Sequence, residues 1–300
     1  MGITFNEKTH KNKRIMAMKE LQIKCPAKIN LTLDVVNRRE DGYHNLKMIM
    51  QEIKLYDILT FSVSEDCQTE IILESDSDDL PLDENNLIYK AAKLFFDKTA
   101  ISASARIHIR KNIPMGAGLG GGSTDAAGTL LALNKIFGEP LTMAELAPMA
   151  KALGADVPFF LHGGCMLAEG IGEILTPVPP LQNAYIVLAK PPIHISTPWV
   201  YKNLVLNECT IHPDTNSVIE ALETNNLELL SKSAGNVLES VTAKEYPQIE
   251  EYKKIMKSHG ASYSLMSGSG SSVFGVFSNE ADARTALEEF KKITTCAYIV

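Results

Sequence analysis

Alternation of apolar and polar residues along the chain predicts β-strands in both of its halves. The first strand starts at Leu21, and its alternation is disturbed at Pro26. Because proline has no N–H to donate to a strand ladder, we expect this strand to be interrupted or bulged over Pro26–Lys28. A turn-rich loop over residues 37–44 follows it. The strand patterns cover residues 21–35, 48–63, 105–110, 184–189 and 296–300, and two further strands flank a glycine loop within residues 262–277.

Apolar residues at helical spacing predict helices between these strands. Asn86 is a candidate N-cap for the first of them, and Thr142 with Glu145 forms a capping box for a helix that ends at Gly154. Pro148 lies inside that helix, so we expect a kink or a break there. The helix after Asn86 covers residues 87–96, and the next one starts at Ser123 or Thr124 as N-cap and stops at Gly138. The remaining predicted helices cover residues 217–224, 227–242, 248–258 and 280–293.

The length and composition indicate a globular protein of about two domains. The chain has 300 residues, of which 45% are hydrophobic and 22% charged, and a domain averages about 150 residues. The proline-rich stretch 177–180 is the candidate linker. We therefore expect a poorly ordered basic leader over residues 1–20, one domain over residues 21–176 and a second over residues 177–300. The grouping of strands and helices in the second half predicts the α+β class.

The overall charge argues against a general nucleic-acid-binding protein. The 29 basic and 36 acidic residues give a net charge of −7, whereas nucleic-acid phosphates require clustered Lys and Arg. Locally the balance is different, because residues 98–124 contain no Asp or Glu but include Lys98, Arg106, Arg110 and Lys111. This positive segment favours attraction of a polyphosphate. An exposed strand face is the simpler explanation of Arg106 and Arg110.

Cysteine usage and apolar runs bear on the compartment. The cysteines are scattered, contain no CxxC and lack zinc-like spacing, which favours small buried thiols in a reducing cytoplasm. No apolar segment near the N-terminus is typical of a secretory signal. No run of about 18 apolar residues predicts a transmembrane helix. The five cysteines are Cys25, Cys67, Cys165, Cys209 and Cys296.

A dense glycine run, PMGAGLGGGST over residues 114–124, precedes a predicted helix; we call it the first glycine loop. Backbone N–H groups and the helix dipole at such a position favour an anion, most naturally phosphate. The Walker pattern GxxxxGK(S/T) fails because no Lys precedes Ser123. GxGxxG matches at Gly116, Gly118 and Gly121, but the match is weak because no acidic residue at a strand end follows about 20 residues later.

A second glycine loop, SGSGSS over residues 267–272, lies between two predicted strands. Taken alone, this loop is as typical of an ordinary turn between two strands as of a binding site. One such loop in each predicted domain would suit a ligand bound between the domains.

Three motifs, taken together, resemble those of the GHMP small-molecule kinases. They are Pro26–Asn30 (PAKIN), the first glycine loop and residues 265–272 (LMSGSGSS). Residues 41–44 (DGYH) and 154–158 (GADVP) narrow the resemblance to members whose acceptor alcohol carries a cytidine diphosphate. The resemblance runs in order from about Leu21 to the C-terminus.

The resemblance implies a fold, a reaction and its partners. The fold would be the two-domain α+β fold of GHMP kinases, with a ribosomal-S5-like N-terminal domain and a ferredoxin-like C-terminal domain. The enzyme would use ATP, with Mg²⁺, to phosphorylate the 2-hydroxyl of a methylerythritol linked to cytidine diphosphate, in the non-mevalonate route to isoprenoid precursors. Its partners would be these small molecules, with neither nucleic acid nor membrane.

The resemblance also implies roles for particular residues. Asp156 would be the base and Lys28 its assisting partner. ATP would contact Pro114, Met115, Gly116, Ala117, Gly118, Leu119, Gly120, Gly121, Gly122, Ser123 and Thr124. The acceptor would contact Asn30, Tyr43, His44, Thr197 and Tyr201, with Tyr43 and Tyr201 stacking on the cytosine and His44 bonding to its edge. The second loop would contribute Gly268, Ser269, Gly270 and Ser271.

Structural interpretations stand beside these roles. Asp156 could instead stabilise its own turn, and Lys28 could extend its ammonium to solvent. Asn30 is also typical of a structural amide, and Tyr201 is also typical of a core tyrosine. The metal ligands stay open: Ser123 or Thr124 offers a hydroxyl, whereas Asp125 is expected to stabilise the helix N-terminus.

Three alternative functions remain. The first is another GHMP kinase, acting on mevalonate, a phosphorylated mevalonate, homoserine or a sugar; the motif at residues 41–44 and Tyr201 disfavour it. The second is a nicotinamide-dependent oxidoreductase, which rests on GxGxxG alone. The third is a catalytically silent nucleotide-binding protein, disfavoured because Lys28 and Asp156 are both present.

Overall fold

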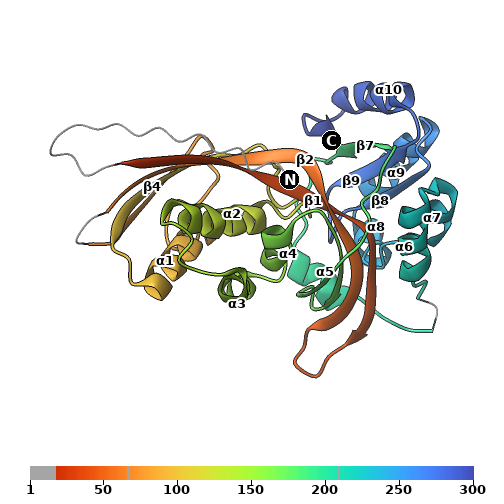
Figure 1. The fold of residues 1–300 in the computed structure, drawn as a ribbon. Coiled ribbons are helices and arrows are strands. Elements are labelled where there is room, and N and C mark those ends of the chain that lie inside the picture. The colour runs from red at the N-terminus through yellow and green to blue at the C-terminus, as the bar shows by residue number, and fades with distance from the viewer. Residues whose placement is uncertain (1–17, 66–67, 209) are drawn as a thin grey trace. The chain divides into compact units, whose positions relative to one another are not determined.

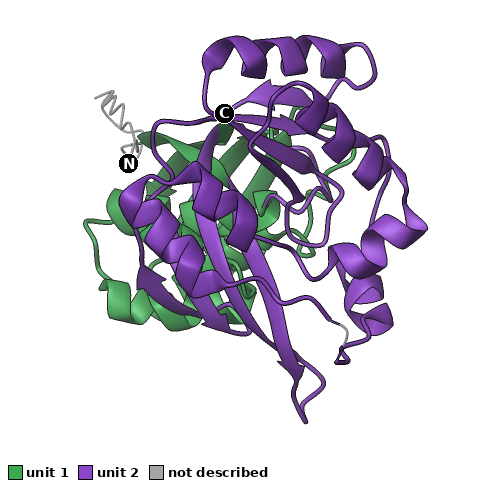
Figure 2. Cartoon of the chain, turned by 90° about the vertical axis from the view of Figure 1, so that its right-hand side faces the viewer, with its two compact units in different colours: residues 1–27, 55–113, 120–163 green, residues 28–54, 114–119, 164–300 purple. Residues whose placement is uncertain are grey.

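The structure, a computed structural model, describes residues 18–65, 68–208 and 210–300 (Figure 1). It divides into two compact units (Figure 2). Unit 1 holds the residues up to Ala27 together with 55–113 and 120–163, and unit 2 holds residues 28–54, 114–119 and 164–300. The strands β1 (Lys19–Arg38) and β2 (His44–Glu65) contribute residues to both units.

The predicted domain boundaries are not settled by this division, and the boundary at residue 177 remains a prediction. Residues 1–17 of the predicted leader lie outside the described residues. The first strand begins at Lys19, two residues before its expected start at Leu21.

Unit 1 combines part of a sheet with a group of helices. Strand β4 (Ala103–Arg110) pairs antiparallel with residues 58–65 of β2 and parallel with β3 (Glu70–Ser75). The helices α1 to α4 pack against one another. A Cβ on Gly128 would lie 2.5 Å from Cys25 Sγ, so glycine lets α2 lie close to β1. The helices are α1 (Leu87–Thr99), α2 (Gly121–Ile136), α3 (Met143–Leu153) and α4 (Val157–His162).

Unit 2 contains a four-stranded antiparallel sheet with the order β10-β7-β9-β8. Helices α9 and α10 pack on this sheet (Figure 1). The strands are β7 (Tyr185–Ala189), β8 (Tyr263–Met266), β9 (Val273–Phe277) and β10 (Ala297–Ile299). The helices are α5 (Thr197–Asn203), α6 (Thr215–Thr224), α7 (Leu227–Ser233), α8 (Glu239–Glu245), α9 (Gln248–Ser258) and α10 (Glu280–Lys291).

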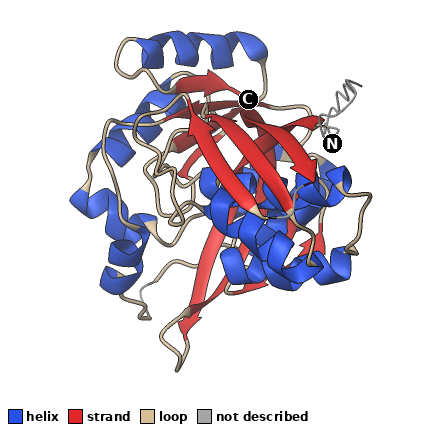
Figure 3. Cartoon of the chain, turned by 90° about the vertical axis from the view of Figure 1, so that its left-hand side faces the viewer, coloured by secondary structure: helices blue, strands red, loops and turns tan. Residues whose placement is uncertain are grey.

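The chain order of this sheet is β7, helices, β8, β9, α10, β10, which is the βαββαβ succession of ferredoxin-like domains. Elsewhere in unit 2, β5 (Cys165–Gly170) pairs with residues 46–51 of β2 and with β6 (Ile174–Pro177). Helices and strands are mixed through the whole chain (Figure 3), so the predicted α+β class is confirmed.

Local helix signals are confirmed where they are strongest. The Asn86 side chain accepts a 2.9 Å hydrogen bond from Ile88 N and caps α1. Thr142 and Glu145 form the predicted capping box of α3, and Gly154 is the residue at which that helix ends. Each signal lies within a few residues of its partner, which explains why the sequence alone reveals it.

An interruption at Pro26 and a break at Pro148 are both absent, whereas a bulge at Pro26–Lys28 and a kink at Pro148 stay predictions. β1 runs through Pro26 without a break, because among the described strands it pairs with β2 alone and an edge strand tolerates a proline. Helix α3 runs through Pro148. Leu146, Met149 and Ala150 are buried in α3, and such packing outweighs the loss of one helix hydrogen bond.

Two predicted helices have different limits. α2 starts at Gly121, with Gly120 as its N-cap at φ +73°, and not after Ser123 or Thr124; glycine adopts this left-handed conformation without a Cβ penalty. The predicted helix 227–242 is two helices, α7 and α8. The chain leaves the helix at residue 234 because residues 235–237 bond to β1 instead. Strands β3, β5 and β6 and helices α4 and α5 were not predicted from the sequence.

None of the helices in the described part of the chain has the length and apolar composition needed to cross a membrane. Cys25 and Cys165 are buried free thiols, and Cys296 is a partly exposed one. Cys67 and Cys209 lie outside the described residues.

Candidate active site

The first and second glycine loops meet at Gly118, within unit 2. Gly118 O accepts hydrogen bonds from Ser267 Oγ at 3.0 Å and from Lys28 Nζ at 3.1 Å. Ser272 N donates to Ala117 O at 3.2 Å. Gly118 has φ +75°, and a Cβ there would lie 2.1 Å from Ser267 O. Only glycine therefore permits this contact.

Lys28 is buried beside both loops. Its side chain donates to Asn30 Oδ1 at 2.8 Å, and its backbone N–H donates to Leu119 O at 3.0 Å. A Cβ on Gly268 would lie 3.5 Å from Lys28 Nζ. Since Lys28 is only 4% exposed, the structure does not support the interpretation in which its ammonium extends to solvent. Lys28 and Asn30 are two residues apart on β1, and their side chains lie together.

The serines of the second loop bond to the protein around it. Ser269 Oγ and Thr197 Oγ1, at the start of α5, are 2.7 Å apart. Ser271 Oγ donates to Ile193 O at 3.1 Å. A Cβ on Gly116 would lie 2.7 Å from the ring of His194. Residues 193–197 thus contact both glycine loops. No local pattern in the sequence predicts this arrangement.

Of the residues predicted to bind the cytosine base, His44 and Tyr201 lie together. The rings of His44 and Tyr201 are 5.3 Å apart with an interplanar angle of 31°. Tyr43 is 61% exposed. Burial, with the charge of Arg38 as a smaller cause, lowers the pKa of His44, so its imidazole is neutral at pH 7 and has one donor and one acceptor nitrogen. Stacking of a base between Tyr43 and Tyr201 remains a prediction.

Gly120 to Thr124 and Asp156 belong to unit 1, whereas Pro114 and Met115 belong to unit 2. Gly120 to Thr124 form the start of α2, where the first N–H groups lack helical acceptors and favour an anion. Thr124 is buried, whereas Ser123 is half-buried. Asp156 is the N-cap of α4, and its side chain makes no capping hydrogen bond to that helix; its role as the base stays a prediction. Because Lys28 lies in unit 2, its pairing with Asp156 remains a prediction.

A buried charge cluster, Lys111 with Asp57 and Asp125, flanks the first glycine loop in unit 1. Lys111 Nζ pairs with Asp57 and lies 2.8 Å from Asp125 Oδ2. Asp57 also accepts from the backbone N–H groups of Asn112 at 2.7 Å and Ile113 at 2.8 Å. The cluster therefore ties the residues that enter the loop to the helix that leaves it.

This cluster corrects two expectations. The charge of Lys111 is compensated by two carboxylates, and Arg106 pairs with Glu74, so these two residues are not available to attract a polyphosphate. Asp125 pairs with Lys111 rather than with the helix N-terminus. The sequence did contain a signal for Asp57, because an acid within the apolar strand pattern of β2 needs a buried partner.

Replacing Asp125 by asparagine should change how stability depends on pH. Burial, together with the Asp57 carboxylate, raises the pKa of Asp125 from 3.8 to about 7, and Asp125 Oδ1 is buried without a hydrogen-bond partner among the described residues. The folded protein therefore keeps a proton that the unfolded chain has lost, and stability falls as pH rises from about 4 to about 7. Over that range, the free energy of unfolding of Asp125→Asn should rise relative to that of the unaltered protein in urea titrations.

The control for this prediction is Asp57→Asn. Its amide oxygen can still accept from the backbone N–H groups of Asn112 and Ile113, but its NH₂ group replaces the carboxylate oxygen that pairs with Lys111, so it should destabilise the protein at every pH in the range. Parallel stability curves for Asp125→Asn and the unaltered protein would contradict the assignment of the raised pKa.

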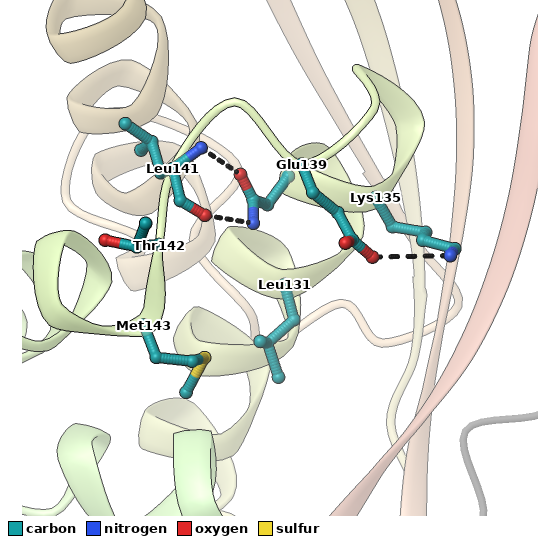
Figure 4. A pocket seen from close by; sticks show the side chains of 7 residues that line it. Leu131, Lys135, Glu139, Leu141, Thr142 and Met143 are labelled. Atoms are coloured by element: carbon teal, nitrogen blue, oxygen red, sulfur yellow. Dashed lines mark hydrogen bonds and ion pairs between the residues drawn. The ribbon is translucent and has the colours of Figure 1, made fainter.

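A surface hollow of about 470 Å³ lies in unit 1, between the end of α2 and the start of α3 (Figure 4). Asn134 closes the turn beside it by exchanging hydrogen bonds of 2.9 and 3.0 Å with the backbone of Leu141. The hollow contains no predicted site residue and is not part of the candidate site. Its lining residues are Leu131, Asn134, Lys135, Glu139, Leu141, Thr142 and Met143.

Two parts of the chain match one family. Residues 86–164 match the N-terminal domain of the GHMP kinases, and residues 218–293 match their C-terminal domain. A solved structure titled 4-(cytidine 5'-diphospho)-2C-methyl-D-erythritol kinase is similar with a TM-score of 0.79 and 34% identity, covering 93% of this chain and 97% of that one. The structure of a homoserine kinase from Cytophaga hutchinsonii is similar with a TM-score of 0.73 and 19% identity, covering 94% of this chain and 92% of that one. At this identity the likeness shows the fold alone.

Curated relatives narrow the family further. A 4-diphosphocytidyl-2-C-methyl-D-erythritol kinase from Lachnoclostridium phytofermentans is 46% identical over 90% of this chain and 92% of its own length. One from Alkaliphilus metalliredigens is 42% identical over 94% and 97%. The chain therefore belongs to the GHMP kinases and, within them, to the family of the 4-diphosphocytidyl-2-C-methyl-D-erythritol kinases.

Proposed function

We propose that the protein transfers the γ-phosphoryl group of ATP to the 2-hydroxyl of 4-diphosphocytidyl-2-C-methyl-D-erythritol. One observation carries this proposal: Lys28 is buried against the backbone of both glycine loops, bonded to Gly118 O and close to Gly268. The names of the relatives supply the acceptor. The alternative acceptors and the nicotinamide reaction find no support in those relatives.

In this proposal, the chemistry is mainly positioning and charge. Phosphoryl transfer requires an in-line arrangement, stabilisation of the charge on the transferred group and an acceptor for the hydroxyl proton. Asp156 takes the proton of the 2-hydroxyl. Lys28 assists Asp156 by orienting the hydroxyl or the γ-phosphate with its ammonium. The hydrogen bonds of Lys28 to Asn30 and Gly118 fix where its charge lies.

The first glycine loop holds the phosphates of ATP in this proposal. The start of α2 supplies N–H groups and a favourable dipole, and Gly120 at φ +73° turns the chain into the helix. No group of three or more His, Cys, Asp or Glu in the described part of the chain is arranged to hold a metal. Mg²⁺ is commonly held by substrate phosphates, water and one or two protein ligands. Ser123 is the more accessible of the two candidate hydroxyls.

The cytosine of the acceptor lies against Tyr43 and Tyr201 in this proposal. The lowered pKa of His44 leaves a neutral imidazole, which can donate one hydrogen bond and accept another at the edge of a base. Its 5.3 Å ring distance from Tyr201 places the edge-binding and stacking groups together. Thr197 bonds to Ser269 of the second loop and offers the acceptor a polar contact beside that loop.

Removing the ring of Tyr43 should weaken binding of the acceptor. Tyr43 is 61% exposed, so its replacement by alanine leaves no large cavity. Stacking of a base on an aromatic ring contributes about 1–3 kcal/mol, and the KM for the acceptor should rise about 10-fold or more. Tyr43→Phe keeps the ring and should retain the original KM. An unchanged KM in Tyr43→Ala would contradict the stacking role.

The choice of acceptor is tested by ADP release with a panel of alcohols. The panel contains the cytidine diphosphate-linked acceptor, mevalonate and homoserine. We expect ATP-dependent release with the first compound alone. Release with another alcohol but not with the first would support the alternative kinase, and binding of reduced nicotinamide cofactor without binding of ATP would support the oxidoreductase.

A further inference from the structure

The turn between α7 and α8, residues 234–238, bonds to β1 just beyond Asn30. Gly235 O accepts from Leu33 N at 2.8 Å and from Thr32 Oγ1 at 3.0 Å. Val237 N donates to Leu33 O at 3.0 Å, and Asn236 forms an isolated parallel bridge with Leu33. The turn is therefore fixed to the strand that carries Lys28.

The same turn holds the second glycine loop through the side chain of Asn236. Asn236 Nδ2 donates to Met266 O and to Gly268 O, each at 2.8 Å. Its Oδ1 accepts from Leu238 N at 3.0 Å. With 8% exposure, the amide is buried, and both hydrogens of its NH₂ group bond to the backbone at the start of the loop.

A neighbouring carboxylate reinforces this contact. Glu239 Oε1 accepts from Met266 N at 2.6 Å, and Glu239 Oε2 lies 2.5 Å from Lys253 Nζ. Asn236 thus bonds to the carbonyl oxygen of Met266, and Glu239 bonds to the N–H of the same residue. Removal of either would leave buried backbone groups without a partner.

We propose that Asn236 is a positioning residue for phosphoryl transfer. It sets the distance between β1, with Lys28 and Asn30, and the second glycine loop, whose Ser267 and Gly268 lie against Gly118 and Lys28. A shift of the Gly268 carbonyl moves the backbone beside the Lys28 ammonium. The inference rests on the proposed function, because it assumes that Lys28 acts on the reacting groups.

The test compares Asn236→Ala with Asn279→Ala. Asn279 caps α10 through a 2.9 Å bond from Asp282 N, so its removal costs stability, about 0.5–2 kcal/mol, without a bond to either loop. Both variants are assayed at a temperature at which circular dichroism shows them folded. We expect kcat of Asn236→Ala to fall about 10-fold to 100-fold, since a misplacement of about 1 Å costs about that much, with a smaller change in KM. Asn279→Ala should keep kcat.

Two further measurements keep the inference falsifiable. Asn236→Asp preserves the shape but places an oxygen against two carbonyls, so its kcat should fall as well. Hydrogen exchange reads the loop without any substrate: amides of residues 267–272 should exchange faster in Asn236→Ala and not in Asn279→Ala. Unchanged exchange, or a folded Asn236→Ala with the kcat of the unaltered protein, would overturn the inference. Absence of turnover in the unaltered protein would instead overturn the proposed function.

Discussion

Replacement of Gly118 by alanine is expected to reduce turnover about 100-fold or more. The new Cβ would lie 2.1 Å from Ser267 O and 3.0 Å from Gly270 O, both backbone atoms. The two glycine loops must then separate, and Gly118 O loses the hydrogen bonds from Ser267 and Lys28. A loss of about 100-fold or more in kcat/KM follows from displacement of the reacting groups by about 1 Å. Steady-state assays with varied ATP measure it.

Gly138→Ala is the matched control. Gly138 has φ +79°, close to the +75° of Gly118, but nothing lies within 4 Å of its Cβ position. It therefore carries the backbone strain alone, about 1–2 kcal/mol, and should lower the melting temperature while kcat/KM stays unchanged. If Gly118→Ala were as active as Gly138→Ala, the close contact of the two loops would have no part in catalysis.

Asp156→Asn is expected to lower kcat by about 10²–10⁴-fold, the usual contribution of a general base. The amide cannot accept the proton of the 2-hydroxyl. Because the Asp156 side chain makes no capping bond to α4, the substitution removes no cap from that helix. Binding of ADP and of the acceptor, measured by calorimetry, should also persist. Turnover close to that of the unaltered protein would exclude Asp156 as the base.

A double-mutant cycle tests whether Lys28 and Asp156 act as a pair. Lys28→Met, Asp156→Asn and the double variant are compared in kcat/KM. If the two residues act as a unit, the double variant should lose little more than either single variant. Additive losses would show that Lys28 serves the glycine loops, through Gly118 and Asn30, independently of Asp156.

Local signals in the sequence predicted much of the fold. Asn86 and the pair Thr142 and Glu145 mark helix starts through bonds that span two or three residues. The alternation over residues 105–110 predicted β4 because one face of that strand is buried. The second glycine loop was recognised between its strands for a different reason: β8 and β9 are mostly apolar runs that are buried along their whole length.

Features that depend on distant residues were not predictable from these signals. The chain leaves a helix at residue 234 because Gly235 bonds to Leu33, 202 positions away in the sequence by 235 − 33. The role of Asn236 depends on Met266 and Gly268, which only the fold brings near. The motifs indicated Lys28 as a site residue, but not that its ammonium bonds to Gly118 O.

Phosphorus NMR of the reaction mixture is the most direct test of the proposed function. ATP, Mg²⁺ and 4-diphosphocytidyl-2-C-methyl-D-erythritol are incubated with the protein, and the phosphate signals are followed. We expect one new phosphomonoester signal that is not split by a proton on the ester carbon, as the tertiary 2-position requires, and that grows in step with ADP and is nearly absent with Asp156→Asn. ADP formed without that signal, or a phosphomonoester at another hydroxyl, would contradict the proposed function.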